Sequence, residues 1–349
     1  MNTRADQLED LVATLDLYTS HHTWTQLTTE QKDLMADVID ARHAHLNAEE
    51  ATPPGACGAF DPHVRWWRPL STRDDFDHLR VVSSAAWLVA DLARPGVIDV
   101  RHDLGIDMRV PIAESVAWWA PMMFAARLIA TTGSNPFLAP GPRWTADLPR
   151  RWTGRTVAAM PFGALWAARG EGPVHVKPAE VKVASVPAAV HENLDVFLVA
   201  SSDRLGKDVM IQVSTVAPYE REFRCFTVDR DVVASSVYLA GGVTWDALDP
   251  SVDHGRTDAL RFARSVLRDP AVAVPDAMAL DVGQHVDGTW SVIEANPAWS
   301  SNPYHASPVG VIASICAAQR PHASYSRWAW KPDAHLDIAR RRPLPTLGA

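Results

Sequence analysis

Residues 279–304, ALDVGQHVDGTWSVIEANPAWSSNPY, contain two strand-like apolar runs with a tight reversal between them. The Asp-Gly pair at the reversal favours a two-residue turn, so a β-hairpin is predicted over residues 277–297. Three polar side chains interrupt the apolar runs: Asp281 on the first strand, and Glu294 and Asn296 on the second. Because residues i and i+2 of a strand point to one face, Glu294 and Asn296 project together, and we expect Asp281 to meet them.

The three side chains of this hairpin offer hard oxygen donors, which Mg²⁺ favours as ligands. A buried carboxylate pair without a cation is costly, because the two charges repel and lose their hydration. We therefore expect a magnesium site at Asp281, Glu294 and Asn296. From spacing alone, a solvated or hydrogen-bonded group of polar residues with a structural role stays open as the alternative.

Two upstream segments carry cations on strand-like sequence. Lys177 lies in VHVKPAEVK, with Lys182 at its end, and Glu222 and Arg224 share one face of the strand REFRCF. Cations neutralise phosphates and Mg²⁺ bridges phosphates to carboxylates, so the order of the three segments is typical of a nucleotide clamp. The alternatives are a lysine that reaches water along its strand and an exposed cross-strand salt bridge.

The segments LPRRWTGRTV, VHVKPAEVK and EREFRCFTVDRDVVASSVYLAGG, followed by the hairpin, resemble in their order an ATP-grasp protein. More narrowly, they are similar to a carboxylate–amine ligase-like group of ATP-grasp domains formerly catalogued as a domain of unknown function. The resemblance covers roughly residues 140–305. It implies two α+β subdomains that clasp ATP, so the predicted fold class is α/β and α+β, with the ATP-grasp fold after a small α/β module.

The resemblance also implies roles for individual residues. Lys177 and Lys182 resemble the nucleotide-binding lysines, and Lys177 and Arg224 would serve the transferred phosphate as catalytic cations. Asp281, Glu294 and Asn296 match the Mg²⁺ ligands. The residues implied to bind ATP are Lys177, Lys182, Gln212, Ser214, Val216, Glu222 and Arg224, with the strand from Gln212 to Val216 as the hinge that meets adenine.

One departure from the family pattern concerns the phosphate-covering loop. Between residues 177 and 208 the chain offers alanine and serine, in PAEVKVASVPAAVHENL, instead of a glycine-rich loop. A Walker-type motif G-x-x-x-x-G-K-[ST] is also missing from the sequence, which excludes a P-loop NTPase.

The implied reaction is ATP-dependent carboxylate–amine ligation, in which an acylphosphate is formed and an amine then attacks it to give an amide. A small-molecule kinase of the same fold would stop after phosphoryl transfer. A nucleotide-binding pseudo-enzyme or adaptor that acts through the N-terminal helices is the third reading. A covalent enzyme nucleophile is not required, and Cys225 is predicted to be a core or strand-face residue.

The chain is predicted to divide into four parts. Residues 1–72 form a helical N-terminal extension with a helix over 24–47, and residues 73–150 form a small α/β module with helices near 74–93 and 115–132. Residues 151–330 form the ATP-grasp domain, split near residue 217. Residues 331–349 are a C-terminal tail that we expect to be surface-bound or frayed.

Composition narrows the partners. The chain of 349 residues has a net charge of −8, with 47% hydrophobic and 21% charged residues. A basic face is therefore not expected, and neither nucleic acid nor a membrane is a predicted partner. Three scattered cysteines suit a reducing cytoplasm. The predicted partners are a small carboxylic acid and an amine, and a homodimer stays open.

Two further clusters were candidates for substrate contacts. Arg150, Arg151 and Arg155 could bind a carboxylate, although a solvated cluster at a domain junction is favoured. His254 and Arg256 precede a helix at a position where ligases often contact substrate, with a purely structural role as the favoured alternative.

Overall fold

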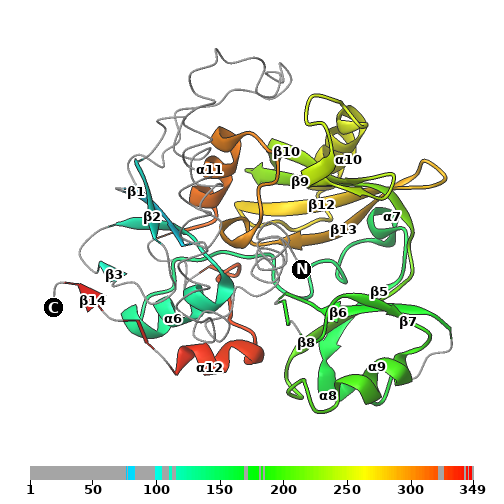
Figure 1. The fold of residues 1–349 in the computed structure, drawn as a ribbon, viewed down its shortest axis with the longest axis horizontal. Helices are drawn as coiled ribbons and strands as arrows, with labels where there is room; N and C mark the ends of the chain where they lie inside the picture. The colour runs from blue at the N-terminus through cyan, green and yellow to red at the C-terminus, as the bar shows by residue number, and fades with distance from the viewer. Residues whose placement is uncertain are drawn as a thin grey trace, which may run out of the picture.

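The structure, a computed structural model, describes residues 76, 78–82, 99–103, 110–111, 115–168, 172–180, 182–183, 185–320, 326–341, 343–344 and 346–347 (Figure 1). The predicted extension over residues 1–72, with its helix over 24–47, lies outside these residues. The division of the chain at residues 72, 150 and 330 stays a prediction.

A parallel three-stranded sheet, in the order β2 (Asp99–Asp103), β1 (His78–Val82), β4 (Val116–Trp119), comes first in the chain. The predicted helix over 74–93 is wrong at β1, where four of the five residues are buried. A strand covered on both faces reads as a continuous apolar run, which periodicity cannot separate from a buried helix.

The predicted helix over 115–132 is also corrected, because its first part is strand β4. Pro121 separates this strand from α6 (Met122–Thr132), since proline is tolerated at a helix start but not in a helix interior. None of the helices within the described ranges is long and apolar enough to cross a membrane.

The C-terminal segment packs against helix α6, so of the two expectations for the tail, surface-bound or frayed, the second is wrong. It forms η4 (Ala334–Leu336) and α12 (Asp337–Arg340), and β14 (Thr346–Leu347) pairs in parallel with β3 (Val110–Pro111). Its apolar side chains Leu336, Ala339 and Leu344 are buried, which explains why the segment is held.

The second sheet is antiparallel and four-stranded, in the order β5 (Val157–Pro161), β8 (Met210–Thr215), β6 (Val174–Pro178), β7 (Ala189–His191). The strand predicted around Lys177 is confirmed as β6, and the strand expected from Gln212 to Val216 is β8, which ends at Thr215. Helices α8 (Phe162–Leu165) and α9 (Leu194–Ser201) pack together through Phe162 and Phe197, beside the sheet (Figure 1).

The third sheet is antiparallel and five-stranded, in the order β11 (Val243–Thr244), β10 (Asp231–Ala240), β9 (Tyr219–Val228), β12 (Ala277–His285), β13 (Trp290–Asn296). The hairpin predicted over 277–297 is confirmed as β12–β13, and β9–β10 forms another hairpin before it in the chain. The β9–β10 hairpin turns at Asp229 and Arg230, which both have positive φ (47° and 66°), as the tight turns that match strand twist require.

The two faces of the five-stranded sheet are covered differently. Helix α10 (Arg256–Arg268) covers one face, where Phe223, Cys225, Leu280 and Val282 form a core with it. Helix α11 (Pro308–Ala317) packs on part of the other face, over Phe226, Ala277 and Ala279. The next residues along β9 and β12 on this second face are polar, and they build the site described below.

The packing of α11 on β10 depends on Gly310. A Cβ atom there would lie 2.2 Å from the Val233 carbonyl oxygen and 2.7 Å from Ala234 Cβ. Neither neighbour can rotate away, because one is backbone and the other is attached directly to it. The helix can therefore approach the strand this closely only with glycine.

We predict that Gly310→Ala lowers the free energy of unfolding by about 1–3 kcal/mol through overpacking. The matched control is Gly206→Ala, where the nearest atom to a new Cβ is Val209 Cγ2 at 3.8 Å. That variant should stay within about 0.5 kcal/mol of the parent protein. Denaturant unfolding measures both, and equal stabilities would contradict the packing described here.

Candidate active site

A β-bulge in the hairpin determines which residues of β13 face the site. Val282 pairs with Val292, but Asp281 pairs with Glu294, so Ile293 is an extra residue without a partner on β12. In the register set by Val282, Glu294 would lie opposite Leu280, on the apolar face that α10 covers. The bulge shifts the register by one and turns Glu294 and Asn296 to the face of Asp281.

Asp281 and Arg224 form a buried, two-pronged ion pair across β12 and β9. Arg224 Nε donates to Asp281 Oδ1 at 2.9 Å and Nη2 donates to Oδ2 at 2.7 Å. Burial alone would lower the pKa of Arg224, but the charge and hydrogen bonds of Asp281 outweigh it and hold that pKa above its usual value. Arg224 is therefore charged at any physiological pH.

Lys177 and Glu294 form a second ion pair, which joins the two antiparallel sheets. Lys177 lies on β6 and Glu294 on β13, and their side chains are largely buried, at 14% and 22% exposure. Burial lowers the pKa of Lys177 to about 8, and the positive charges of Arg155, Arg224 and Lys182 act in the same direction. This amine therefore titrates close to neutral pH.

Asn296 connects the two carboxylates. Its Nδ2 donates to Glu294 Oε1 at 2.7 Å and to Asp281 Oδ2 at 3.2 Å. The described residues hold no group of three or more His, Cys, Asp or Glu side chains gathered as for a metal ion. The donor set of Asp281, Glu294 and the Asn296 amide oxygen still fits Mg²⁺, which takes few protein ligands and keeps water and phosphate oxygens as the rest.

The expectation that these carboxylates repel one another without a metal is corrected by their partners. Asp281 is neutralised by Arg224 and Glu294 by Lys177, so each negative charge already has a cation beside it. Two side chains predicted to face phosphates thus serve as counter-ions of the predicted metal ligands.

The residues predicted to contact adenine lie on strand β8, which pairs with the Lys177 strand β6, or directly after it. Gln212 lies directly opposite Lys177 in the β6–β8 ladder, and Ser214 lies opposite His175. Both Gln212 and Ser214 are buried, whereas Val216, just after β8, is 41% exposed. Residues 216–218 connect the four-stranded sheet to β9 of the five-stranded sheet, directly after the strand expected to be the hinge.

Lys182 and Glu222 occupy the borders of this arrangement. Lys182 is exposed in the connection after β6, close enough for its charge to lower the pKa of Lys177. Glu222 accepts a hydrogen bond from Tyr238, and burial raises its pKa. Glu222 and Arg224 are two apart on β9 and so share the face of Asp281.

Two tyrosines that the sequence did not single out form a wall next to Arg224. The rings of Tyr238 and Tyr304 stack with centroids 5.2 Å apart, and the Arg224 guanidinium lies 5.1 Å from the Tyr304 centroid. Tyr304 has φ of +50°, and Asn302 Oδ1 accepts its backbone N–H at 2.9 Å. A non-glycine residue held in this conformation is costly and is found at functional sites more often than elsewhere.

Three residues of the other candidate clusters, Arg151, His254 and Arg256, lie away from this face. Arg151 pairs with Asp269, and the His254 carbonyl accepts from Arg221 Nη1 at 3.3 Å. Arg221 alternates with Glu222 and Arg224 along β9, so His254, together with Arg256 at the start of α10, belongs to the opposite sheet face. These residues are therefore not brought to the site.

Cys225 is a core residue, as predicted. It is fully buried, and burial raises the pKa of its thiol to about 12, so it stays protonated near neutral pH. A nucleophilic thiolate is not available at this position.

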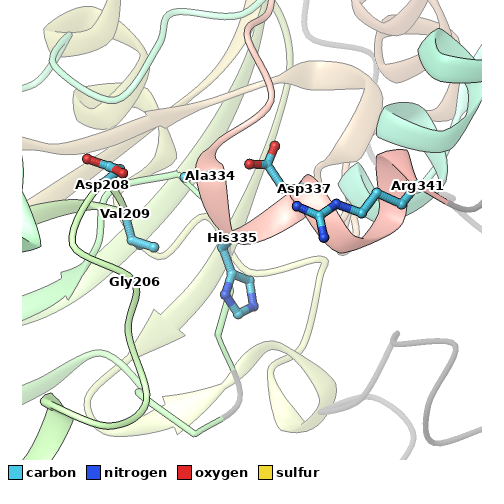
Figure 2. Close-up of a pocket in the computed structure, with 7 residues that line it drawn as sticks. All are labelled: Gly206, Asp208, Val209, Ala334, His335, Asp337 and Arg341. Carbon is cyan, nitrogen blue, oxygen red and sulfur yellow. The ribbon is translucent and has the colours of Figure 1, made fainter.

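A separate pocket of about 430 Å³ lies between the loop before β8 and the C-terminal segment. Figure 2 shows its polar lining, with His335 and Asp337 from η4 and α12, and Asp208 from the loop. None of the predicted site residues lines it, so it is distinct from the cluster around Glu294.

Arg155 is the site neighbour whose position differs most from expectation. It is not part of a solvated cluster: it is 8% exposed and donates to the backbone of β13, at Val292 O (2.6 Å) and Ile293 O (2.8 Å). No local sequence signal marks this role, because the acceptors are main-chain oxygens 137 and 138 residues away.

The comparisons with known proteins agree with this fold. Residues 152–314 match the family model of the ATP-grasp domain, R-2-K clade family 2. This segment is therefore an ATP-grasp domain and has the ATP-grasp fold. No curated protein matches the sequence.

Three solved structures are similar at low identity. The crystal structure of D-cycloserine synthetase DcsG is 14% identical and covers 68% of this chain and 99% of its own, with a TM-score of 0.38. A RimK domain protein ATP-grasp from Sphaerobacter thermophilus DSM 20745 is 16% identical and covers 69% of this chain and 98% of its own, with a TM-score of 0.40. Cdc123 from Schizosaccharomyces pombe is 13% identical and covers 46% of this chain and 83% of its own, with a TM-score of 0.28. Similarity this weak says nothing of what this chain acts on.

We predict that Glu294→Gln destabilises the ligand-free protein at pH 7 by about 1–3 kcal/mol, because it leaves the Lys177 ammonium buried without its counter-ion. The substituted glutamine can still accept the Asn296 hydrogen bond, so the change is mainly one of charge. The parent's advantage requires protonated Lys177. It is therefore present below the folded pKa of about 8 and lost as the pH rises through it.

Denaturant unfolding of both proteins between pH 6.5 and 9.5 measures this dependence. Glu220→Gln is the control, because Glu220 is exposed and 3.9 Å from Arg221. Its stability difference from the parent should be small and flat with pH. A Glu294→Gln difference that is equally flat would mean that Lys177 and Glu294 are not coupled.

Proposed function

We propose that the protein is an ATP-dependent ligase that joins a carboxylic acid to an amine as an amide or peptide bond. One observation carries the proposal: Lys177, Arg224, Asp281, Glu294 and Asn296 converge on one face next to the connection between two antiparallel sheets. The match of residues 152–314 to the ATP-grasp domain supports ATP as the nucleotide.

The proposed nucleotide position follows from the order of the elements. The backbone of β8 from Gln212, through Ser214 to Val216, would meet adenine, since it leads directly into the connection between the sheets. Lys177 and Arg224 would then face the phosphates, with Lys182 and Glu222 at the borders. In the ligand-free arrangement the two cations hold carboxylates, so we propose that ATP competes with those carboxylates for them.

Mg²⁺ is the cofactor that the donor set supports. Asp281, Glu294 and the Asn296 amide oxygen would hold it, and it would supply charge neutralisation at the ATP phosphates. The Asn296 amide now points its nitrogen at both carboxylates. Since amide orientation follows the hydrogen-bond network, a rotation of this group by about 180° would present the oxygen instead.

The proposed reaction has two steps. A carboxylate oxygen of the acid attacks the γ-phosphorus of ATP, the bond to the bridging oxygen of ADP breaks, and an acylphosphate forms. An amine then attacks the acyl carbon, loses a proton, and inorganic phosphate leaves as the amide forms. The chain's part is to position the reactants and stabilise charge, for which Lys177 and Arg224 are proposed as the catalytic cations.

The tyrosine wall and the buried, protonated Cys225 both suit such a reaction. Tyr238 and Tyr304 fix the Arg224 side chain on one side while Asp281 holds it on another. With Cys225 buried and protonated, no thioester on the enzyme is proposed. A small acid and a small amine as substrates, a cytoplasmic location and a homodimer stay predictions.

We predict that ATP with Mg²⁺, well above its dissociation constant, stabilises the protein by about 1–3 kcal/mol in thermal or denaturant unfolding. Glu294→Gln should lower ATP turnover by at least about a hundredfold, because metal-held phosphates supply several kcal/mol of charge stabilisation. Cys225→Ala, in the core on the other sheet face, should keep turnover within about threefold of the parent.

Products of an ATP-consumption screen over amino acids and small acids separate the readings. Amine-dependent amide formation with release of ADP and phosphate supports the ligase. A stable phosphorylated product without any amine would instead indicate the kinase. A protein that responds to no nucleoside triphosphate would leave only the adaptor.

A further inference from the structure

Arg155 is a buried cation without a carboxylate partner among the described residues. None of the ion pairs in that part of the chain includes it. Its four acceptors are all uncharged: the carbonyl oxygens of Val292 (2.6 Å), Ile293 (2.8 Å) and Thr153 (3.2 Å), and the hydroxyl of Tyr219 (2.8 Å). Burying a guanidinium among neutral acceptors costs free energy, because the charge loses its hydration and gains no negative partner.

The acceptors on β13 are the two residues of the bulge. Consecutive carbonyls of a regular strand point to opposite edges, yet Val292 O and Ile293 O accept from one guanidinium. Ile293 is the extra residue of the β12–β13 ladder. Among the described strands β13 is also the last of its sheet, so none of them bonds its outer edge. The planar fork of Arg155 supplies the donors that the ladder lacks there.

The same guanidinium ties this bulge to the start of β9. Tyr219 accepts from Arg155, and its hydroxyl lies 3.0 Å from Ser291 Oγ, which is also 2.8 Å from His285 Nε2. The fit is close, because a Cβ at Gly283 would lie 2.3 Å from the Tyr219 ring. Tyr219 follows directly on residues 216–218, which connect the two antiparallel sheets, so this connection and the bulge share one network.

We infer that Arg155 is a positioning residue: by holding the bulge at Val292 and Ile293, it aims Glu294 and Asn296 at the metal-bound nucleotide. It reaches no reacting atom itself and acts through β13. The effect on the metal-bound nucleotide rests on the proposed function. The claim that Arg155 holds the bulge rests only on its hydrogen bonds to β13. The consequence is specific: Arg155 matters more for the gain in ATP affinity that Mg²⁺ brings than for ATP binding without metal.

The test compares Arg155→Met, Arg155→Lys and the control Arg151→Met with the parent protein. Methionine fills space but donates nothing, and lysine keeps the charge without the two-pronged fork. Arg151 lies four residues upstream, is 58% exposed and pairs with Asp269 on the other side of the sheet. It belongs to no part of the proposed site.

The first measurement is hydrogen–deuterium exchange of the ligand-free proteins. In Arg155→Met, peptides covering residues 290–297 should exchange at least about tenfold faster, while α9 and α10 keep their protection. Arg151→Met should leave 290–297 unchanged. Unchanged exchange in Arg155→Met would overturn the claim that this side chain holds the bulge.

The second measurement is calorimetry of ATP binding with and without Mg²⁺. The factor by which Mg²⁺ tightens ATP binding should fall about 10–100-fold in Arg155→Met, as for other residues that orient metal ligands, with metal-free binding changed less than threefold. Arg155→Lys should lie between the two. In a Glu294→Gln background the Arg155 substitution should have no further effect on that factor.

A purely structural role would instead weaken ATP binding equally with and without Mg²⁺, and that result overturns the inference. Should Arg155→Met not fold, Arg155→Lys decides, and a parent-like Mg²⁺ factor in it, with parent-like exchange at 290–297, counts against the inference. A parent protein that binds no ATP contradicts the proposed function and the metal half of the inference, whereas the exchange experiment still decides the structural half.

Discussion

The site depends on one extra residue in one strand. Ile293 has no partner on β12, and this bulge is what turns Glu294 and Asn296 from the apolar face under α10 to the polar face with Asp281. A slip of one residue in a strand exchanges its two faces completely. The bulge is bound on one side by the β12 ladder and on the other by the Arg155 guanidinium, so its geometry is specified from two sides.

The charges on this face are balanced before any ligand arrives. Arg224 holds Asp281 and Lys177 holds Glu294, with Asn296 donating to both carboxylates. Such a cluster does not need a metal to fold, and its cations and anions are the same groups that phosphates and Mg²⁺ would take as partners. Ligand binding would then be an exchange of ionic partners. Because the pKa of Lys177 is lowered and that of Arg224 is raised, Lys177 would leave its carboxylate more easily than Arg224.

Much of this could be predicted from sequence where the signal is local. The D…E-x-N hairpin, the E-x-R strand and the lysine strand each carry polar residues in apolar runs, and all three are strands as predicted. The parallel strand β1 was mistaken for a helix, because a strand buried on both faces has no period of two. The bulge and the role of Arg155 were not predicted, because neither an extra residue in a hairpin nor a donor to distant carbonyl oxygens leaves a pattern in the sequence. Counting residues outward from the turn would pair Asp281 with Ile293, whereas the structure pairs it with Glu294.

The most direct test of this arrangement is a crystal structure with a non-hydrolysable ATP analogue and Mn²⁺ in place of Mg²⁺, because anomalous scattering locates Mn²⁺ directly. We expect the anomalous peak between Asp281 and Glu294, the Asn296 amide oxygen turned towards it, and Lys177 and Arg224 released towards the phosphates. A nucleotide bound elsewhere, or a metal peak with both ion pairs unchanged, would contradict the assignment of this face as the nucleotide site.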